Sequence, residues 1–201
     1  MPGESPPMSA VVEAAKPRPY QLRILAESAI MIALATVLNS IKLFTMPEGG
    51  TVTLGAMVPI LFLALRRGVK VGMAAGAVFG IIDVYFEPFI YNPIQFLLDY
   101  PFAYGALGLA GLFSGRVNSP RNRGGLTPVS LSVAAVALGI FARFVCHFFS
   151  GLIFFASYAP AGESPALYSA IYNASYLVPE FFISAFVISI LVGRRITLVR
   201  L

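Results

Sequence analysis

The sequence has one cysteine, one histidine and no tryptophan among its 201 residues. The single cysteine, Cys146, excludes an intrachain disulfide. It stands next to His147, but adjacent helical residues point about 100° apart, and one thiol with one imidazole is too few ligands for zinc. We therefore expect neither a metal site nor a cofactor.

Motifs for catalysis are also missing. There is no G-x-x-x-x-G-K-[ST] phosphate loop, so the chain cannot hydrolyse ATP in that way. Neither H-E-x-x-H nor G-x-S-x-G occurs, and no nucleophile–base pair is evident. The sequence therefore predicts a protein that is not an enzyme. If a solute crosses here, the energy must come from an ion gradient or from a partner protein.

Charged residues are scarce, at 11%, whereas 58% of the residues are hydrophobic and the mean hydropathy is +0.81. A soluble domain of this size needs far more polar surface, and runs of about 20 apolar residues match a hydrocarbon core of about 30 Å. The sequence therefore predicts an integral membrane protein. Its net charge of +5 is better explained by membrane topology than by nucleic acid, which we do not expect as a partner.

Six apolar stretches predict an all-α bundle of six transmembrane helices. The second stretch is short and contains Pro59, so its boundaries are the least well defined. The predicted spans are residues 21–44, 53–65, 69–86, 93–113, 127–155 and 167–192. The division that follows is a disordered cytoplasmic tail at 1–20, a membrane domain at 21–193 and a basic cytoplasmic tail at 194–201.

Lysine and arginine gather on one side of this topology. Of the 14 such residues, all but Lys42 and Arg143 lie before or at the start of the first span, after the sixth, or around the junctions of spans two and three and of spans four and five. The opposite loops contain Glu48, Glu87 and Glu163. By the positive-inside rule, both termini are cytoplasmic in a multi-pass protein of the cell membrane.

Polar residues occur well inside the last three spans. Helical rise places Asp99, His147 and Asn173 roughly 9–12 Å below the outer surface, with Tyr168 at the mouth of the sixth span. A charge at bilayer depth costs about 2.5–3.5 kcal/mol on insertion scales, so such residues normally face a polar cavity or one another. We expect a binding site in this layer, although His147 or Asn173 alone could serve packing between helices.

Arg143 and Glu180 lie at a similar, deeper level. Arg143 is one turn below His147 on the same helix face, and Glu180 is on the sixth span. Because an unpaired guanidinium at this depth is costly, we expect Glu180 or Asp99 to neutralise Arg143. The prediction is a structural ion pair between Arg143 and Glu180.

The side chains of this layer suit a flat, cationic heterocycle. A carboxylate attracts the positive charge, aromatic faces add cation–π attraction, and an amide reads ring nitrogens. A phosphorylated ligand fits poorly because the layer has few cations. The loop above it, Met46-Pro47-Glu48-Gly49-Gly50, is rich in turn residues and is either a closing lid or a plain connector.

Several motifs follow one another in a fixed order between about residues 22 and 192. They are Met46-Pro47-Glu48-Gly49-Gly50 with Thr51-Val52-Thr53-Leu54, then Leu65-Arg66-Arg67-Gly68, then Leu98-Asp99-Tyr100-Pro101 running into Gly108-Leu109-Ala110-Gly111-Leu112-Phe113, then Arg143-Phe144-Val145-Cys146-His147-Phe148 with Gly151, and finally Tyr168-Ser169 through Tyr172-Asn173. This succession resembles the thiamine-specific substrate-capture (S) subunits of energy-coupling factor (ECF) transporters.

The resemblance implies a six-helix bundle that binds thiamine at its extracytoplasmic end. It places Asp99, His147, Phe155, Tyr168 and Asn173 at positions that line the family's pocket, and Glu48, Gly49 and Gly50 in its lid. Ala29 and Ala33, in Ala-x-x-x-Ala spacing that permits close helix approach, look like the family's docking motif. The implied partners are a transmembrane coupling subunit and two ATPase subunits.

Two departures from the family pattern bear on the ligand. Family members often stack thiamine on tryptophan, whereas Phe155 occupies one such position here and attracts a cation more weakly. Asp99 stands where some members carry glutamate. A thiamine precursor or analogue therefore stays open as the ligand. The alternative to ATPase-driven uptake is a stand-alone proton-coupled carrier in which Glu180 and His147 relay protons.

Overall fold

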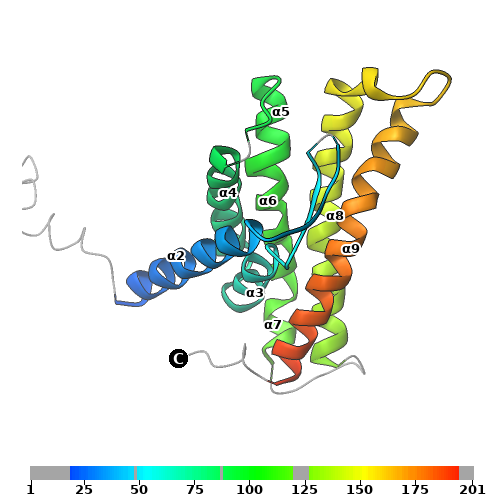
Figure 1. Cartoon of the computed structure of the whole chain (residues 1–201). Helices are drawn as coiled ribbons and strands as arrows, with labels where there is room; N and C mark the ends of the chain where they lie inside the picture. Colours follow the sequence, from blue (N-terminus) through cyan, green and yellow to red (C-terminus); the bar gives the residue numbers. More distant parts are fainter. Residues whose placement is uncertain (1–18, 48, 87, 120–126, 195–201) are drawn as a thin grey trace, which may run out of the picture.

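The computed structural model describes residues 19–47, 49–86, 88–119 and 127–194. Most of the tail predicted at 1–20, nearly all of the tail predicted at 194–201 and Glu48 of the predicted lid lie outside these residues. Helices α4, α6, α8 and α9 run side by side, whereas α2 lies at a steep angle to them and extends to one side of the bundle (Figure 1).

Five helical segments are long and apolar enough to cross a membrane, which confirms the predicted class of multi-helix membrane protein. Four of them start at a proline, whose fixed φ suits the first turn of a helix. The five segments are α2 (Pro19–Asn39), α4 (Val69–Phe86), the continuous stretch Pro93–Val117, α8 (Pro128–Phe154) and α9 (Pro165–Gly193).

The spans predicted at 21–44 and 53–65 need correction. The chain leaves α2 at Asn39 and forms an antiparallel hairpin of β1 (Lys42–Thr45) and β2 (Thr51–Thr53). The helix that follows the hairpin, α3 (Val58–Arg67), has ten residues and is therefore about 15 Å long. This is half the thickness of the hydrocarbon core. Apolar composition alone does not distinguish a hairpin strand from a helical span. The fold class holds with this short hairpin added.

The segment Pro93–Val117 changes its helical form along its length. It comprises α5 (Pro93–Leu97), the π-helical turn η1 (Leu98–Phe102), α6 (Ala103–Ala106), the 3-10 helix η2 (Leu107–Phe113) and α7 (Ser114–Val117). Pro101 lies inside η1 and has no N–H to donate to the regular α-helical ladder. The widened turn that results carries Asp99, and π-helical turns of this kind are frequent at functional sites.

Three glycines spaced four residues apart let α4 approach this segment closely. A Cβ on Gly76 would lie 2.2 Å from the carbonyl oxygen of Tyr104, and one on Gly80 would lie 2.5 Å from that of Tyr100. A Cβ on Gly72 would meet the Cα of Gly108 at 3.0 Å. Small residues at such an interface permit direct backbone packing between membrane helices.

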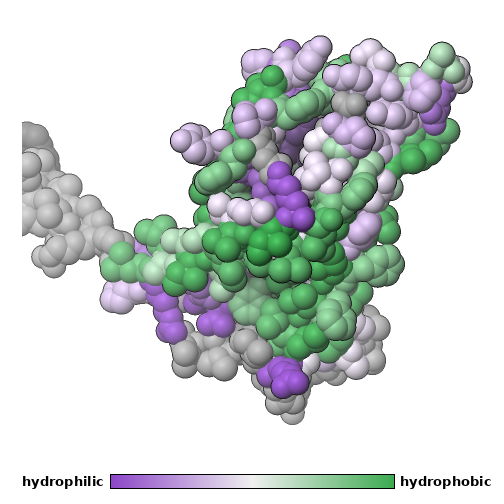
Figure 2. All heavy atoms as spheres, in the orientation of Figure 1, coloured by the Kyte–Doolittle hydropathy of each residue, from purple (hydrophilic) through white to green (hydrophobic). Residues whose placement is uncertain are grey.

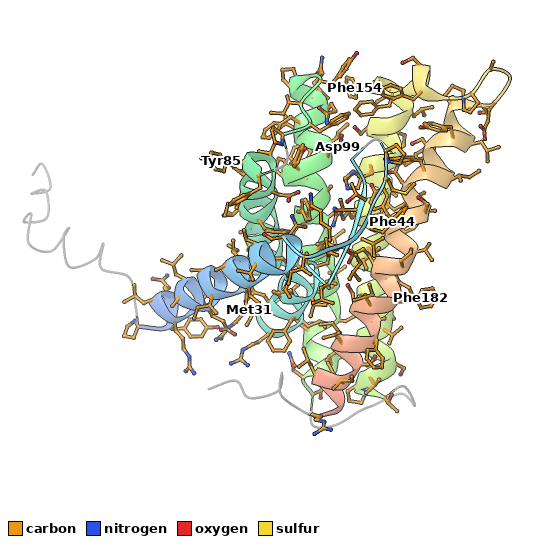
Figure 3. All side chains as sticks on the ribbon, viewed as in Figure 1. Met31, Phe44, Tyr85, Asp99, Phe154 and Phe182 are labelled. Atoms are coloured by element: carbon orange, nitrogen blue, oxygen red, sulfur yellow. The ribbon has the colours of Figure 1, made fainter. Side chains whose placement is uncertain are left out.

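The core surrounds α3, in which eight of ten residues are buried. The sides of the bundle instead expose large apolar side chains, and Figure 2 shows them as a broad hydrophobic surface. Phe182 on α9, for example, is 64% exposed and points away from the helices (Figure 3). Such a surface fits a lipid environment.

Candidate functional site

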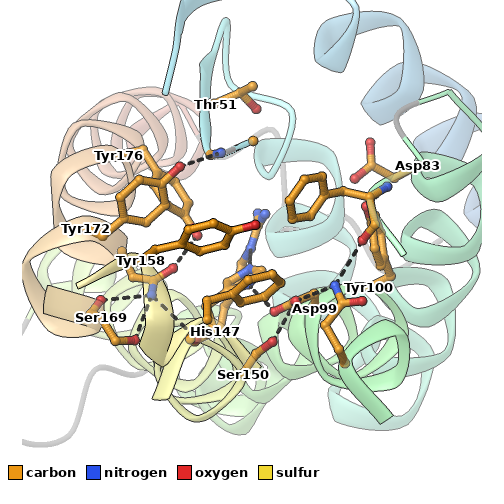
Figure 4. A pocket seen from close by; sticks show the side chains of 18 of the residues that line it. Thr51, Asp83, Asp99, Tyr100, His147, Ser150, Tyr158, Ser169, Tyr172 and Tyr176 are labelled. Atoms are coloured by element: carbon orange, nitrogen blue, oxygen red, sulfur yellow. Dashed lines mark hydrogen bonds and ion pairs between the residues drawn. The ribbon is translucent and has the colours of Figure 1, made fainter. Parts of the chain in front are cut away.

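A cavity of about 310 Å³ opens between the helices in the half of the molecule that contains α5 and the C-terminal end of α8 (Figure 4). Pockets of about 300–1,000 Å³ commonly hold small ligands. The cavity wall carries two carboxylates, one guanidinium and one imidazole, which belong to Asp83, Asp99, Arg143 and His147. Its aromatic lining consists of Phe89, Tyr100, Tyr104, Phe155, Tyr158, Tyr168, Tyr172 and Tyr176.

Asp99 is the centre of the polar contacts. Its Oδ1 lies 3.0 Å from Nδ1 of His147, and its Oδ2 accepts hydrogen bonds from Gln95 Nε2 and Ser150 Oγ, both at 2.7 Å. The carboxylate therefore bridges η1 to α5 on its own segment and to α8 across the cavity. Figure 3 shows Asp99 inside the bundle.

The contacts of His147 define which ring nitrogen carries the proton. Arg143 Nε, which can only donate, lies 3.1 Å from Nε2 of His147. Nε2 is then an acceptor, so Nδ1 carries the proton and donates it to Asp99. In this arrangement the imidazole is neutral and is held from both sides.

The predicted ion pair between Arg143 and Glu180 is wrong. The Arg143 guanidinium carbon lies 3.9 Å from the centroid of the Tyr104 ring, a cation–π contact, and its Nε is engaged by His147. Its charge is therefore met by an aromatic face and an imidazole, and neither Glu180 nor Asp99 forms an ion pair with it among the residues the structure describes.

Glu180 anchors the hairpin to α9 instead. Its Oε1 accepts from the backbone N–H of Thr53 at 2.5 Å and from Thr53 Oγ1 at 2.6 Å. Both residues are buried. Matching depth on two helices did not establish that Arg143 and Glu180 point toward each other.

Asn173 forms the opposite wall of the cavity. Its Nδ2 donates to the Ser169 carbonyl at 2.9 Å, and its Oδ1 accepts from Tyr176 OH at 2.7 Å. Ser169 Oγ donates to the Phe148 carbonyl of α8 at 2.9 Å. A Cβ on Gly151 would lie 2.3 Å from Ser169 Oγ, so a glycine is needed where α8 and α9 meet here.

Phe155 belongs to an aromatic group at the mouth of the cavity. Its ring stacks on Tyr158, with centroids 5.7 Å apart and an interplanar angle of 13°, and lies 5.7 Å from Phe89. Tyr91 meets the same ring edge-on at 6.0 Å. Tyr168 also lines the cavity, so all five residues expected to bind the ligand line the same cavity.

The tip of the β1–β2 hairpin covers part of the cavity. Gly49, Gly50 and Thr51 line it, and the N–H of Gly50 donates to Tyr172 OH at 3.4 Å. A Cβ on Gly50 would lie 2.5 Å from the Tyr176 ring, so the hairpin backbone rests directly on α9. Ala29 and Ala33, by contrast, are exposed on α2, away from the cavity.

Asp83 is the charged cavity residue that the sequence analysis did not identify. It lies on α4 and is 8% exposed, and its two carboxylate oxygens accept from Asn39 Nδ2 at 2.6 Å and Tyr104 OH at 2.8 Å. A charged residue inside the predicted span 69–86 was itself the signal. Gln95 and Ser150 were missed as well, and being uncharged they gave no comparable signal.

The fold and the cavity define the class: a multi-pass membrane protein with a polar, aromatic-lined pocket for a small solute. The family model described as thiamine transporter protein matches residues 25–200. The chain therefore belongs to the thiamine transporter protein family.

Known relatives agree with this assignment. The thiamine transporter ThiT of Bacillus subtilis is 39% identical over 177 residues, which cover 85% of this chain and 91% of the relative. ThiT of Lacticaseibacillus paracasei is 31% identical over 176 residues, covering 85% and 87%. A solved structure of ThiT from Listeria monocytogenes superposes with a TM-score of 0.78 at 27% identity and covers 89% of this chain and 98% of its own.

Proposed function

We propose that this chain is a substrate-capture (S) subunit that binds thiamine from outside the cell and delivers it for uptake driven by a partner ATPase module. The observation that carries the proposal is the cavity, whose polar and aromatic groups suit a flat cation. Membership in the thiamine transporter protein family supports the same ligand.

The charges of the wall favour a monocation. Among the lining residues that the structure describes, and with the imidazole neutral, the two carboxylates of Asp83 and Asp99 exceed the single guanidinium of Arg143 by one negative charge. Thiamine carries one fixed positive charge on its thiazolium ring. Binding it would bring the charges of this wall to zero, which is the favoured state for buried groups away from water.

Each predicted site residue receives a role from its position. Asp99 offsets the positive charge, while His147 and Phe155 pack on the rings. Tyr168 and Asn173 donate or accept hydrogen bonds at the opposite wall. The hairpin that carries Gly49 and Gly50, together with the neighbouring Glu48, acts as the lid.

The proposed orientation puts the cavity outside and both termini in the cytoplasm. Arg116 on α7 and Arg194 at the end of α9 lie at the end of the bundle opposite the cavity, as the positive-inside rule requires (Figure 1). The tails at 1–20 and 194–201 are then cytoplasmic and flank the membrane domain at 21–193. Ala29 and Ala33 present a small-residue surface on α2 to the coupling subunit, which joins two ATPase subunits.

Calorimetry on the purified protein tests the ligand. We expect saturable binding of thiamine without ATP, and weaker binding of its aminopyrimidine half, which lacks the cationic ring. No detectable binding at micromolar thiamine would refute the proposal. Tighter binding of the aminopyrimidine alone would move the assignment to a precursor.

Uptake into vesicles tests the energy source. Vesicles that contain the chain together with the coupling subunit and both ATPases should accumulate thiamine only when ATP is supplied. Vesicles that contain the chain alone should not. Accumulation by the chain alone that collapses with the proton gradient would instead support the stand-alone carrier.

A further inference from the structure

A side-chain hydrogen bond joins helix α2 to the cavity wall. Of its 21 residues only Ala35 and Asn39 are buried, and none of the residues of α2, all of which the structure describes, lines the cavity. Asn39, its last residue, donates from Nδ2 to Asp83 Oδ1 at 2.6 Å. This bond joins the helix to a carboxylate of the wall.

From Asp83 the contacts continue to the proposed ligand carboxylate. Tyr104 OH donates to Asp83 Oδ2 at 2.8 Å, and the ring of the same tyrosine faces the Arg143 guanidinium. Arg143 donates to His147, which donates to Asp99. Each link is a hydrogen bond or cation–π contact between buried or half-buried groups, where such contacts are strong.

A residue near the middle of α2 makes a different set of contacts. Glu27 pairs with Arg66 at 2.5 Å and with Arg67, both at the C-terminal end of α3. These arginines are outside the cavity wall. The ion pairs of Glu27 therefore hold α2 to α3 outside the cavity, whereas the hydrogen bond of Asn39 reaches the cavity wall.

We propose that the Asn39–Asp83 hydrogen bond couples the position of α2 against α4 to ligand binding in the cavity. Asp83 is then a positioning residue that acts through Tyr104 and Arg143. The inference rests on the proposed function, in which α2 faces the partner subunit. Thiamine binding favours the position of α2 in which Asn39 bonds Asp83. Displacement of α2 by the partner weakens thiamine binding by the same factor, because coupling between two sites is reciprocal.

The test compares thiamine affinities of purified variants, each measured by calorimetry well below its melting temperature. Asn39→Ala and Asp83→Asn should each weaken binding by about fivefold or more, within the usual range of such couplings. Glu27→Gln is the matched control because it weakens the ion pairs that hold the middle of α2 to α3, and its affinity should stay within about twofold of the wild type. Asn39→Ser, too short to reach Asp83, replaces Asn39→Ala if that variant does not fold.

The double variant Asn39→Asp/Asp83→Asn separates coupling from a direct charge effect. It keeps both hydrogen bonds with the roles exchanged, since the amide placed on α4 would donate to the carboxylate placed on α2 and accept from Tyr104. We expect it to restore affinity to within about threefold of the wild type.

Three results would overturn the inference: wild-type affinity in Asn39→Ala, equal weakening by Glu27→Gln, or a double variant as weak as Asp83→Asn. A wild-type protein that binds no thiamine would refute the proposed function itself, and the coupling with it.

Discussion

At the scale of single residues, the cavity is organised around one carboxylate. Asp99 receives hydrogen bonds from three residues on two separate helical segments. Those donors fix its orientation before any ligand arrives. Ligand binding to such a preorganised carboxylate loses little conformational entropy, because the side chain is already held in one rotamer.

Replacing Asp99 with asparagine should weaken thiamine binding about 10- to 100-fold. The side chain keeps its shape but loses its charge, and interactions with charged groups contribute about 1.5–3 kcal/mol. Calorimetry measures the change. Glu163→Gln, an acid of the loop before α9 that is not part of the cavity wall, should bind like the wild type. Equal affinity in Asp99→Asn would show that the charge is not used.

Glu180→Gln should be well tolerated, because an amide oxygen still accepts from Thr53. Glu180→Ala removes that acceptor and leaves two buried donors of Thr53 unpaired, at a cost of about 1–3 kcal/mol. Thermal unfolding in detergent should show a lower melting temperature for the alanine variant only. If Glu180→Gln were equally destabilised, Arg143 would depend on the carboxylate charge after all.

Depth along a helix was enough to find part of the site but not its pairings. Asp99, His147 and Asn173 were recognised because polar groups at bilayer depth are costly and so need a shared environment. The direction in which Arg143 points depends on how α8 is rotated about its axis relative to Tyr104. The hydrophobic periodicity of the sequence does not determine that rotation. The charge of Asp83 inside a predicted span could have been recognised in the same way, but its partners Asn39 and Tyr104 come from other helices and could not.

At the scale of elements, apolar length predicted the last helices closely and the first two poorly. The spans at 69–86, 127–155 and 167–192 differ from α4, α8 and α9 by at most two residues at either end. Apart from Lys42, the residues of β1 and β2 are apolar or β-branched, so their composition alone resembles that of a neighbouring apolar helix. They become a hairpin because Thr53 pairs with Glu180 and Gly50 rests on Tyr176.

Gly76→Ala should destabilise the bundle by about 1–3 kcal/mol, the usual cost of overpacking. Its added methyl would lie 2.2 Å from the carbonyl oxygen of Tyr104, and backbone cannot move aside as a flexible side chain does. The matched control is Gly115→Ala on α7, where nothing lies within 4 Å of the new methyl. Melting curves that fall equally for both variants would contradict the close packing of α4.

At the scale of the whole molecule, the cavity and the cytoplasmic charges should lie at opposite ends. Single cysteines introduced as Glu163→Cys and Arg194→Cys, each in a Cys146→Ser background, report the two ends. An impermeant maleimide added to intact cells should label the first and not the second. The reverse pattern would invert the proposed orientation and place the cavity toward the cytoplasm.

The central claim is that thiamine occupies the cavity between η1, α8 and α9, and a structure determined with thiamine bound tests it most directly. We expect the cationic ring near the Asp99 carboxylate, an aromatic ring against Phe155, and the hairpin tip closed over the ligand. Thiamine bound elsewhere, with this cavity empty at saturating ligand, would contradict the account.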